Sequence, residues 1–128
     1  IKDWVKRDGT GNSSVYRFEV GAHPEVLSEF EASFDKIKAV YRNAQEYLSA
    51  ILMKKNALVY WPDNWCRSFK RHCLRPWSFF ISRETKIPAD ARVIVFHGKP
   101  DPHDAIEGES GKWYRRFKPA TWINEHWR

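Results

Sequence analysis

Apolar residues recur at the three- and four-residue spacing of a helix in the first half of the chain. The pattern predicts a helix that opens near Pro24 and a shorter helical piece around residues 37–41. A third helix is predicted to start at Asn43, whose side chain can cap it, and to end near Asn56. One apolar stripe follows this third helix, formed by Ala44, Tyr47, Leu48, Ile51 and Leu52. Such a stripe is typical of a helix that packs on a core.

Short apolar runs predict strands elsewhere in the chain. They lie at residues 1–5, 15–18, 58–61 and 92–96. The last run, Arg92-Val93-Ile94-Val95-Phe96, is β-branched and continuous, as in the buried middle of a sheet. A short helix is expected at residues 103–106 and a terminal one at 119–128, whereas residues 65–86 follow no regular pattern. Strands mixed with helices predict an α/β or α+β fold.

Length and composition fit one compact domain. The chain has 128 residues, 42% of them hydrophobic, and contains no internal repeat or Gly/Ser linker. We therefore expect residues 1–128 to form a single domain. Two cysteines are too few for a disulfide scaffold, and no apolar run approaches the roughly 18 residues of a membrane span. These features predict a soluble, cytoplasmic chain without a transmembrane segment. Because it starts at Ile1, we expect it to be part of a longer protein.

Positive charge is concentrated in the second half. Residues 1–64 carry nine Lys or Arg and nine Asp or Glu, whereas residues 65–128 carry thirteen and seven. Five of the seven tryptophans also lie there, at positions 65, 77, 113, 122 and 127. Cations can meet phosphate while flat rings stack on bases or sugars, so this half could bind a polyanion. A basic surface over an aromatic core explains the same pattern.

The clearest candidate for chemistry follows the predicted strand at residues 92–96. There His97 could ligate a divalent metal, Gly98 could let a phosphate approach the main chain, and Lys99 could neutralise its charge. Ligands of open α/β folds sit at the carboxyl ends of strands. A hydrogen-bonded structural histidine is the competing interpretation.

Two weaker candidates lie in the first half. Asn12 and Ser13 precede a predicted strand and can hydrogen-bond sugar hydroxyl groups. Gln45 and Glu46 stand at a helix start, where exposed amides and polar side chains can meet a polar ligand. Turn formation and helix capping would account for both patterns equally well.

Other site classes are absent from the sequence. Cys66, His72 and Cys73 lack the C-x-x-C pair and the fourth ligand of a structural zinc site, so ordinary thiols are the better interpretation. The chain has no Gly-rich phosphate loop, no G-x-S-x-G elbow and no H-E-x-x-H helix.

The order of the three candidate segments carries a family resemblance. Gly11-Asn12-Ser13-Ser14-Val15, Asn43-Ala44-Gln45-Glu46-Tyr47-Leu48 and Val95-Phe96-His97-Gly98-Lys99-Pro100 together resemble the later half of nucleotide-sugar glycosyltransferases of the GT-A fold. The likeness is to glycogenin-like and bacterial polysaccharide enzymes, and it spans nearly the whole chain. It implies an α/β fold with a mixed sheet and flanking helices, the C-terminal part of such a transferase.

The resemblance also implies roles for particular residues. His97 would be a ligand of Mn²⁺ or Mg²⁺, and Gly98 and Lys99 would contact the diphosphate. Asn12, Ser13, Gln45 and Glu46 would line the pocket for the donor sugar and acceptor.

Two positions and one motif depart from the family pattern. Ser14 stands where the family usually has Gly, and Ala44 stands where an acid is common. The Asp-x-Asp metal motif, with the nucleotide-binding half, lies in the family upstream of the segment that matches Ile1. We therefore expect the isolated chain to be inactive, and no residue is assigned as catalytic base.

The resemblance predicts a nucleotide-diphospho-sugar donor and a glycan acceptor as partners, with no specific nucleic acid, and leaves self-association open. A module that binds nucleic acid or anionic glycan through the second half is the alternative, and a structural domain without activity is a third interpretation.

Overall fold

The computed structural model describes residues 1–6, 8–74, 84–111 and 117–127. The chain divides into two compact units, Ile1–Asp63 (unit 1) and Asn64–Arg128 (unit 2). Helices and a two-stranded parallel sheet make the fold mixed α/β. None of the helices within the described ranges is long and apolar enough to cross a bilayer.

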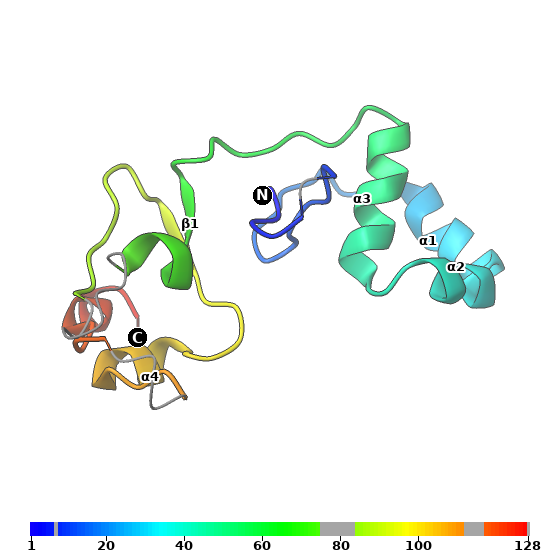
Figure 1. Ribbon diagram of the computed structural model, residues 1–128. Helices are drawn as coiled ribbons and strands as arrows, with labels where there is room; N and C mark the ends of the chain where they lie inside the picture. The colour runs from blue at the N-terminus through cyan, green and yellow to red at the C-terminus, as the bar shows by residue number, and fades with distance from the viewer. Residues whose placement is uncertain (7, 75–83, 112–116, 128) are drawn as a thin grey trace. The chain divides into compact units, whose positions relative to one another are not determined.

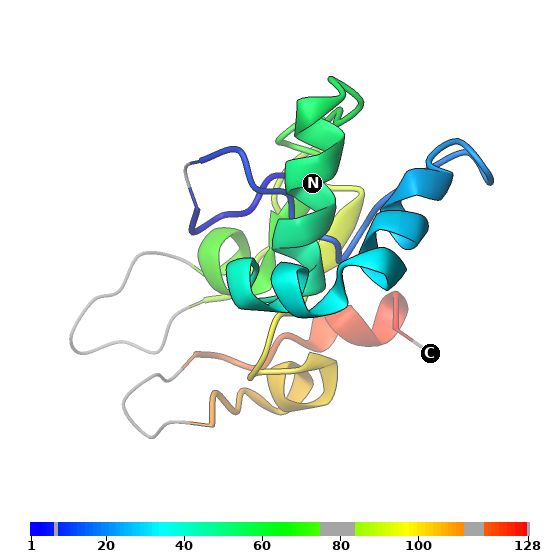
Figure 2. The same ribbon diagram turned by 90° about the vertical axis from the view of Figure 1, so that its right-hand side faces the viewer.

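Unit 1 contains the three predicted helices. They are α1 (Pro24–Ala32), α2 (Phe34–Val40) and α3 (Ala44–Lys54), and α3 lies beside the other two (Figures 1 and 2). The capping prediction for α3 is confirmed, because the Asn43 side chain accepts the amide of Glu46 at 3.0 Å. Tyr47 of α3 is buried, with ring centroids 5.7 Å from Phe30 and 5.6 Å from Tyr41.

The strands predicted in unit 1 are not formed. The described residues of this unit contain only one isolated bridge, between Lys2 and Gly11. Near the bridge, the Asp3 carboxylate accepts the amides of Val5 and Lys6 at 2.7 and 2.9 Å, which turns the chain instead of extending it. Residues 15–18 and 58–61 have strand composition but no strand partner among the described residues. The alternation of these segments was not sufficient to form a sheet, because a strand also needs a second strand to pair with.

Unit 2 is built on a parallel strand pair. Strand β1 (Cys66–Ser68) pairs with β2 (Val93–Val95) in the register Cys66↔Val93. The prediction of a strand at 92–96 is confirmed for its centre. The expectation that it lies in the middle of a larger sheet is wrong for the described residues, where β2 has β1 as its one neighbour.

Helical turns follow both strands of unit 2. A π-helix, η1 (Phe69–Cys73), continues directly from β1, in a region where no element was predicted. Helix α4 (Pro102–Glu107) confirms the short helix expected near residue 103. The predicted terminal helix is shorter and tighter, a 3-10 helix over Thr121–Glu125 (η2), and Arg128 lies outside the described residues.

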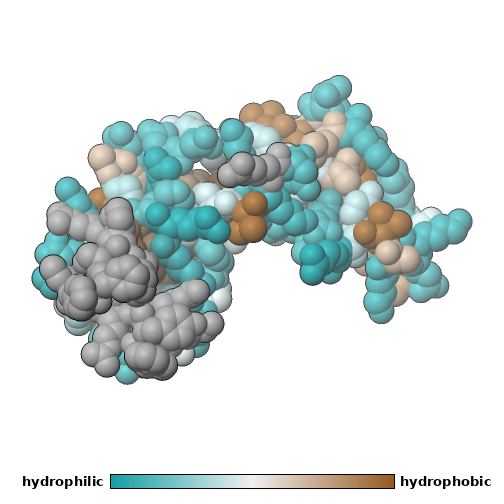
Figure 3. All heavy atoms as spheres, in the orientation of Figure 1, coloured by the Kyte–Doolittle hydropathy of each residue, from teal (hydrophilic) through white to brown (hydrophobic). Residues whose placement is uncertain are grey.

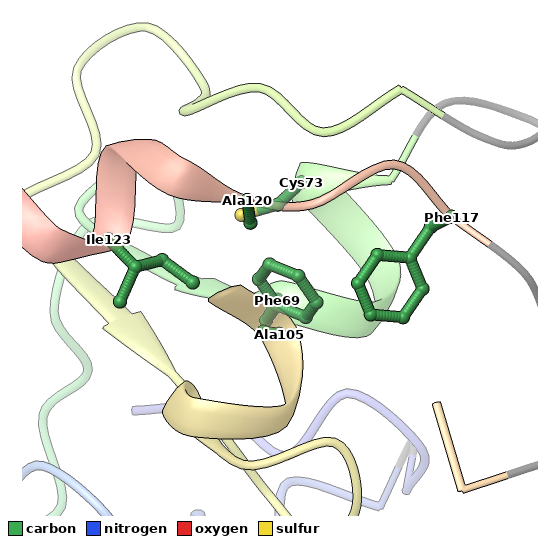
Figure 4. Packing of buried hydrophobic residues seen from close by; sticks show 6 residues of the cluster. All are labelled: Phe69, Cys73, Ala105, Phe117, Ala120 and Ile123. Carbon is green, nitrogen blue, oxygen red and sulfur yellow. The ribbon is translucent and has the colours of Figure 1, made fainter. Parts of the chain in front are cut away.

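The hydrophobic core of unit 2 gathers around Phe69. Its side chain is completely buried, with Phe117 on one side and Ile123 on the other (Figure 4). The Phe69 ring stacks on Phe96 at a centroid distance of 4.8 Å and meets Trp122 at 6.2 Å. The six buried members of this core are Phe69, Cys73, Ala105, Phe117, Ala120 and Ile123.

Unit 1 buries much less of its apolar surface. Helices α1 and α2 contain no buried residue, and apolar side chains are exposed over the helices of this unit (Figure 3). Val20 is 90% exposed and Leu27 is 61% exposed. Unit 1 therefore depends more on hydrogen bonds than on a core.

Candidate functional site

A cavity of about 710 Å³ lies within unit 1. Its size falls in the range of pockets that take small-molecule ligands. Polar and aromatic side chains contribute to its wall, among them Asn12, Ser13, Tyr16, Arg17, Phe18, Gln45, Ser49 and Trp61. Three of the four residues that were predicted to bind the sugar, Asn12, Ser13 and Gln45, therefore share one wall.

Hydrogen bonds to α3 fix one side of this cavity. The amide of Gly11 donates to Ser49 Oγ at 2.9 Å, and the amide of Ser13 donates to Gln45 Oε1 at 3.2 Å. Gln45 and Ser49 are four residues apart, so they project from the same face of α3. Two alternate amides of the loop thus meet two acceptors on successive turns of the helix.

Gln45 uses both ends of its side-chain amide within the chain. While Oε1 accepts the Ser13 amide, Nε2 donates to Asp3 Oδ2 at 3.1 Å. Burial raises the pKa of Asp3, but the hydrogen bonds from Lys6, Val5 and Gln45 outweigh it, so the pKa lies below its ordinary value. Asp3 therefore stays ionised as a strong acceptor. Gln45 is better placed to hold the loop than to hold a ligand.

Asn12 and Ser13 keep polar groups for a ligand. Asn12 Oδ1 accepts the amide of Ser14 at 2.9 Å. Its Nδ2 has no hydrogen-bond acceptor among the described residues, and the same holds for the Ser13 hydroxyl group. Both side chains thus offer hydrogen-bond donors to an occupant of the cavity.

Glu46 is absent from the residues that line the cavity. Its carboxylate pairs with Lys6 and also accepts the amide of Arg42 at 2.9 Å. The hydrogen bond from Lys6 lowers the pKa of Glu46. The Glu46 carboxylate is therefore held at the N-terminus of α3 by bonds within the chain.

His97 lies in unit 2, directly after β2, and is half-buried. Its Nε2 is 2.7 Å from the buried Ser68 Oγ, and its carbonyl oxygen accepts a hydrogen bond from Lys70 Nζ at 2.6 Å. The ammonium of Lys70 would also lie 3.6 Å from a Cβ placed on Gly98. The segment after β2 is therefore held by hydrogen bonds, and Lys70 lies beside it as a second cation in addition to Lys99.

Lys99 is held by carboxylates. Its Nζ lies 2.8 Å from Asp101 Oδ2 and 2.8 Å from Asp104 Oδ2. These two hydrogen bonds raise the pKa of Lys99 above its ordinary value. The same two acids form the capping box of α4, each accepting the amide of the other at 3.0 Å. Because two carboxylates already compensate its charge, Lys99 is a poor diphosphate ligand in this arrangement.

The residues around His97 do not fit a divalent cation. Mn²⁺ and Mg²⁺ favour carboxylate and phosphate oxygens, whereas the His97 imidazole lies against the Ser68 hydroxyl group and the Lys70 ammonium binds the His97 carbonyl oxygen. Across the described ranges, no three His, Cys, Asp or Glu side chains gather into a metal site.

The thiols of Cys66 and Cys73 are buried and unpaired by any disulfide. Burial raises the pKa of Cys73 to about 12, so it is a protonated core residue and not a thiolate ligand. The nearby His72 Nδ1 accepts the amide of Ser68 at 2.9 Å. The interpretation of these residues as structural agrees with this packing.

The predicted site residues thus fall into two groups. Asn12, Ser13 and Gln45 meet in unit 1, and His97, Gly98 and Lys99 meet in unit 2. No family model, curated protein or solved structure matches the chain. Trp77 and Trp113 of the basic half lie outside the described residues.

Two polar residues of these groups, Ser49 and Lys70, were not among the predicted site residues. Ser49 could have been found from its position four residues after Gln45, on the same face of a predicted helix. Lys70 gave no such signal, because it lies in the stretch where no element was predicted.

Proposed function

We propose that the chain is part of a GT-A-type nucleotide-sugar glycosyltransferase and that the cavity of unit 1 receives the sugar. One observation carries the proposal: Asn12 and Ser13 line the cavity together with Gln45, 32 positions away from Ser13 along the chain. These are residues to which the family resemblance assigns contacts with the donor sugar.

The chemistry of the cavity wall suits a sugar. Asn12 Nδ2 and the Ser13 hydroxyl supply donors for sugar oxygens, while the Gly11 and Ser13 amides are already satisfied by α3. The rings of Tyr16, Phe18 and Trp61 provide apolar faces on which the C–H side of a pyranose can pack. The loop is fixed before a ligand arrives, which lowers the entropic cost of binding. Metal and diphosphate contacts at His97 and Lys99 form no part of the proposal.

A titration of the full chain with sugars tests this function. Amide NMR spectra would be recorded with glucose, galactose, N-acetylglucosamine and a uridine diphosphate sugar. We expect concentration-dependent shifts confined to residues that line the cavity. Shifts for none of these compounds would overturn the proposal. Steeply salt-dependent binding of nucleic acid without any sugar response would instead favour the basic second half as the functional part.

Variants of the loop sharpen the test. Asn12→Asp keeps the Oδ1 acceptor for the Ser14 amide but replaces the Nδ2 donor with an oxygen. It should weaken sugar binding about tenfold, the worth of roughly one hydrogen bond. Ser13→Ala should weaken binding as well, whereas the matched control Ser14→Ala should not, because Ser14 is outside the cavity wall. Equal binding by Asn12→Asp and the parent chain would contradict the assignment.

A further inference from the structure

Residues 16–20 form an exposed segment with the alternation of an edge strand. Tyr16, Phe18 and Val20 are 62%, 63% and 90% exposed, and the intervening Arg17 and Glu19 are exposed as well. The rings of Tyr16 and Phe18 lie 5.7 Å apart, nearly parallel at 21°. Tyr16 and Phe18 thus share one side of the segment, as alternate residues do in an extended strand, and a turn begins at Val20.

The backbone of this segment has almost no partner in its own chain. Among the described residues, the amides of residues 16–20 donate no hydrogen bond. Within the described part of the chain, their one backbone hydrogen bond runs from the amide of Ala22 to the carbonyl of Glu19, at 3.1 Å. An exposed row of unpaired amides and carbonyls is a template on which another strand can pair.

The sequence of the segment is complementary to itself in the antiparallel direction. When two copies pair about Phe18, Arg17 of each copy faces Glu19 of the other, and Tyr16 faces Val20. Two cross-strand ion pairs then form on one face, and apolar pairs form on the opposite face. Parallel pairing in register would instead set Arg17 against Arg17 and Glu19 against Glu19. Charge therefore selects the antiparallel arrangement.

We propose that residues 16–20 pair with the same segment of a second copy, giving a dimer with twofold symmetry. The occupant is a second copy because each charged side chain of the segment finds its opposite at the position that symmetry dictates. The proposal rests on the free amides and on the charges of Arg17 and Glu19 and does not require sugar binding, although Tyr16, Arg17, Phe18 and Glu19 also line the cavity of unit 1. A five-residue strand buries little surface, so the dimer should be weak and form at high protein concentration.

Sedimentation equilibrium of the full chain over a wide range of concentrations provides the test. Arg17→Glu and Glu19→Arg each replace two attractive pairs with two repulsive ones, and each should raise the dimer dissociation constant about tenfold or more. An equimolar mixture of the two variants should dimerise again, because one partner then carries two carboxylates and the other two guanidinium groups. The double variant R17E/E19R should also recover the dimer, because it exchanges the two members of every pair.

Controls separate this interface from general effects of charge. Glu31→Arg and Lys36→Glu reverse exposed charges on α1 and α2, outside the segment, and should leave the dissociation constant unchanged. Circular dichroism confirms that each variant is folded. A parent chain that stays monomeric at every concentration would overturn the proposal. So would a dimer that neither single variant weakens, or a mixture no tighter than its components.

Discussion

The two units hold themselves together in different ways. Unit 2 buries Phe69, Phe117 and Ile123 in one hydrophobic core, whereas α1 and α2 of unit 1 contain no buried residue. Unit 1 relies instead on hydrogen bonds from loop amides to side chains of α3. In unit 2, which has more tryptophans, Trp122 packs against the hydrophobic core. The other half leaves its rings beside a cavity.

Aromatic content alone therefore does not locate a binding site in this chain. Phe69 is fully buried and stacks on the partly buried Phe96, so its ring has no surface left for a ligand. Tyr16 and Phe18 are also stacked, yet both remain more than half exposed on the cavity wall. An aromatic ring that stays exposed on a cavity wall is a better indicator of a binding site than the number of aromatic residues.

The largest effect is expected in the core of unit 2. Phe69→Ala removes a fully buried ring that touches Phe96, Phe117 and Trp122, and should cost about 3–5 kcal/mol of unfolding free energy. Urea unfolding followed by tryptophan fluorescence measures it. The matched control Phe34→Ala, at a side chain 46% exposed, should cost much less. Similar losses of unfolding free energy for the two variants would contradict the conclusion that unit 2 depends on a buried core more than unit 1 does.

A smaller effect is expected where α3 holds the loop of unit 1. Ser49→Ala removes the acceptor of the buried Gly11 amide and should cost about 1–3 kcal/mol, because that donor is left unsatisfied. Faster hydrogen exchange of the Gly11 amide should accompany the loss. Ser28→Ala on the exposed face of α1 is the control. Unchanged exchange at Gly11 would show that the loop does not depend on this bond.

The bond between α3 and α1 should matter less. Tyr47 donates its hydroxyl proton to the carbonyl of Val26 at 2.7 Å, and Tyr47→Phe keeps the ring while removing the bond. The expected loss is about 0.5–1.5 kcal/mol of unfolding free energy, measured by urea denaturation. Tyr16→Phe, at an exposed ring, should have no measurable effect. A neutral Tyr47→Phe would mean that ring packing alone joins these helices.

The smallest effect is a local one in acid. The hydrogen bond from Lys99, with that from the Asp104 amide, lowers the pKa of Asp101 below its ordinary value of 3.8. The folded carboxyl group therefore binds its proton less readily than the unfolded one. Its contribution to stability is present above about pH 4 and is lost as the pH falls through the lowered pKa. The amide signal of Asp104 should report this loss during an acid titration.

A matched variant checks the cause. Asp101→Asn keeps an oxygen acceptor for the Asp104 amide but carries no charge, so the part of the acid-dependent shift that comes from residue 101 should disappear, leaving that of the Asp104 carboxyl group itself. A shift in the parent chain with a midpoint at or above the ordinary aspartate value would contradict the assigned ion pair.

Much of the helical structure could be predicted from the sequence. Asn43 as a cap, Pro24 in a first turn and the acids around α4 are local signals that act within a few residues. The strands could not be predicted in the same way. Residues 15–18 have the composition of a strand and remain unpaired, while Cys66–Ser68 is too short to show a pattern and pairs with β2.

The candidate site was predictable only in part. The resemblance singled out Asn12, Ser13 and Gln45, which the fold brings to one cavity. It also assigned Glu46, His97 and Lys99 to ligands, whereas these side chains already bond within the chain. Sequence shows that a charged group is present, but its availability depends on neighbours such as Asp101 and Asp104. That Asp101 and Asp104 both bind the Lys99 ammonium is visible only in the fold.

Gly11 sets a limit for anyone who wishes to redesign this protein. A methyl group on its Cα would lie 3.3 Å from Ser49 Oγ, a tight contact that would require a shift of a few tenths of an ångström in the side chain that accepts the Gly11 amide. Libraries aimed at altered ligand preference should therefore keep this position constant. Diversity is better introduced at Tyr16 and Phe18, where solvent leaves room for larger or smaller replacements.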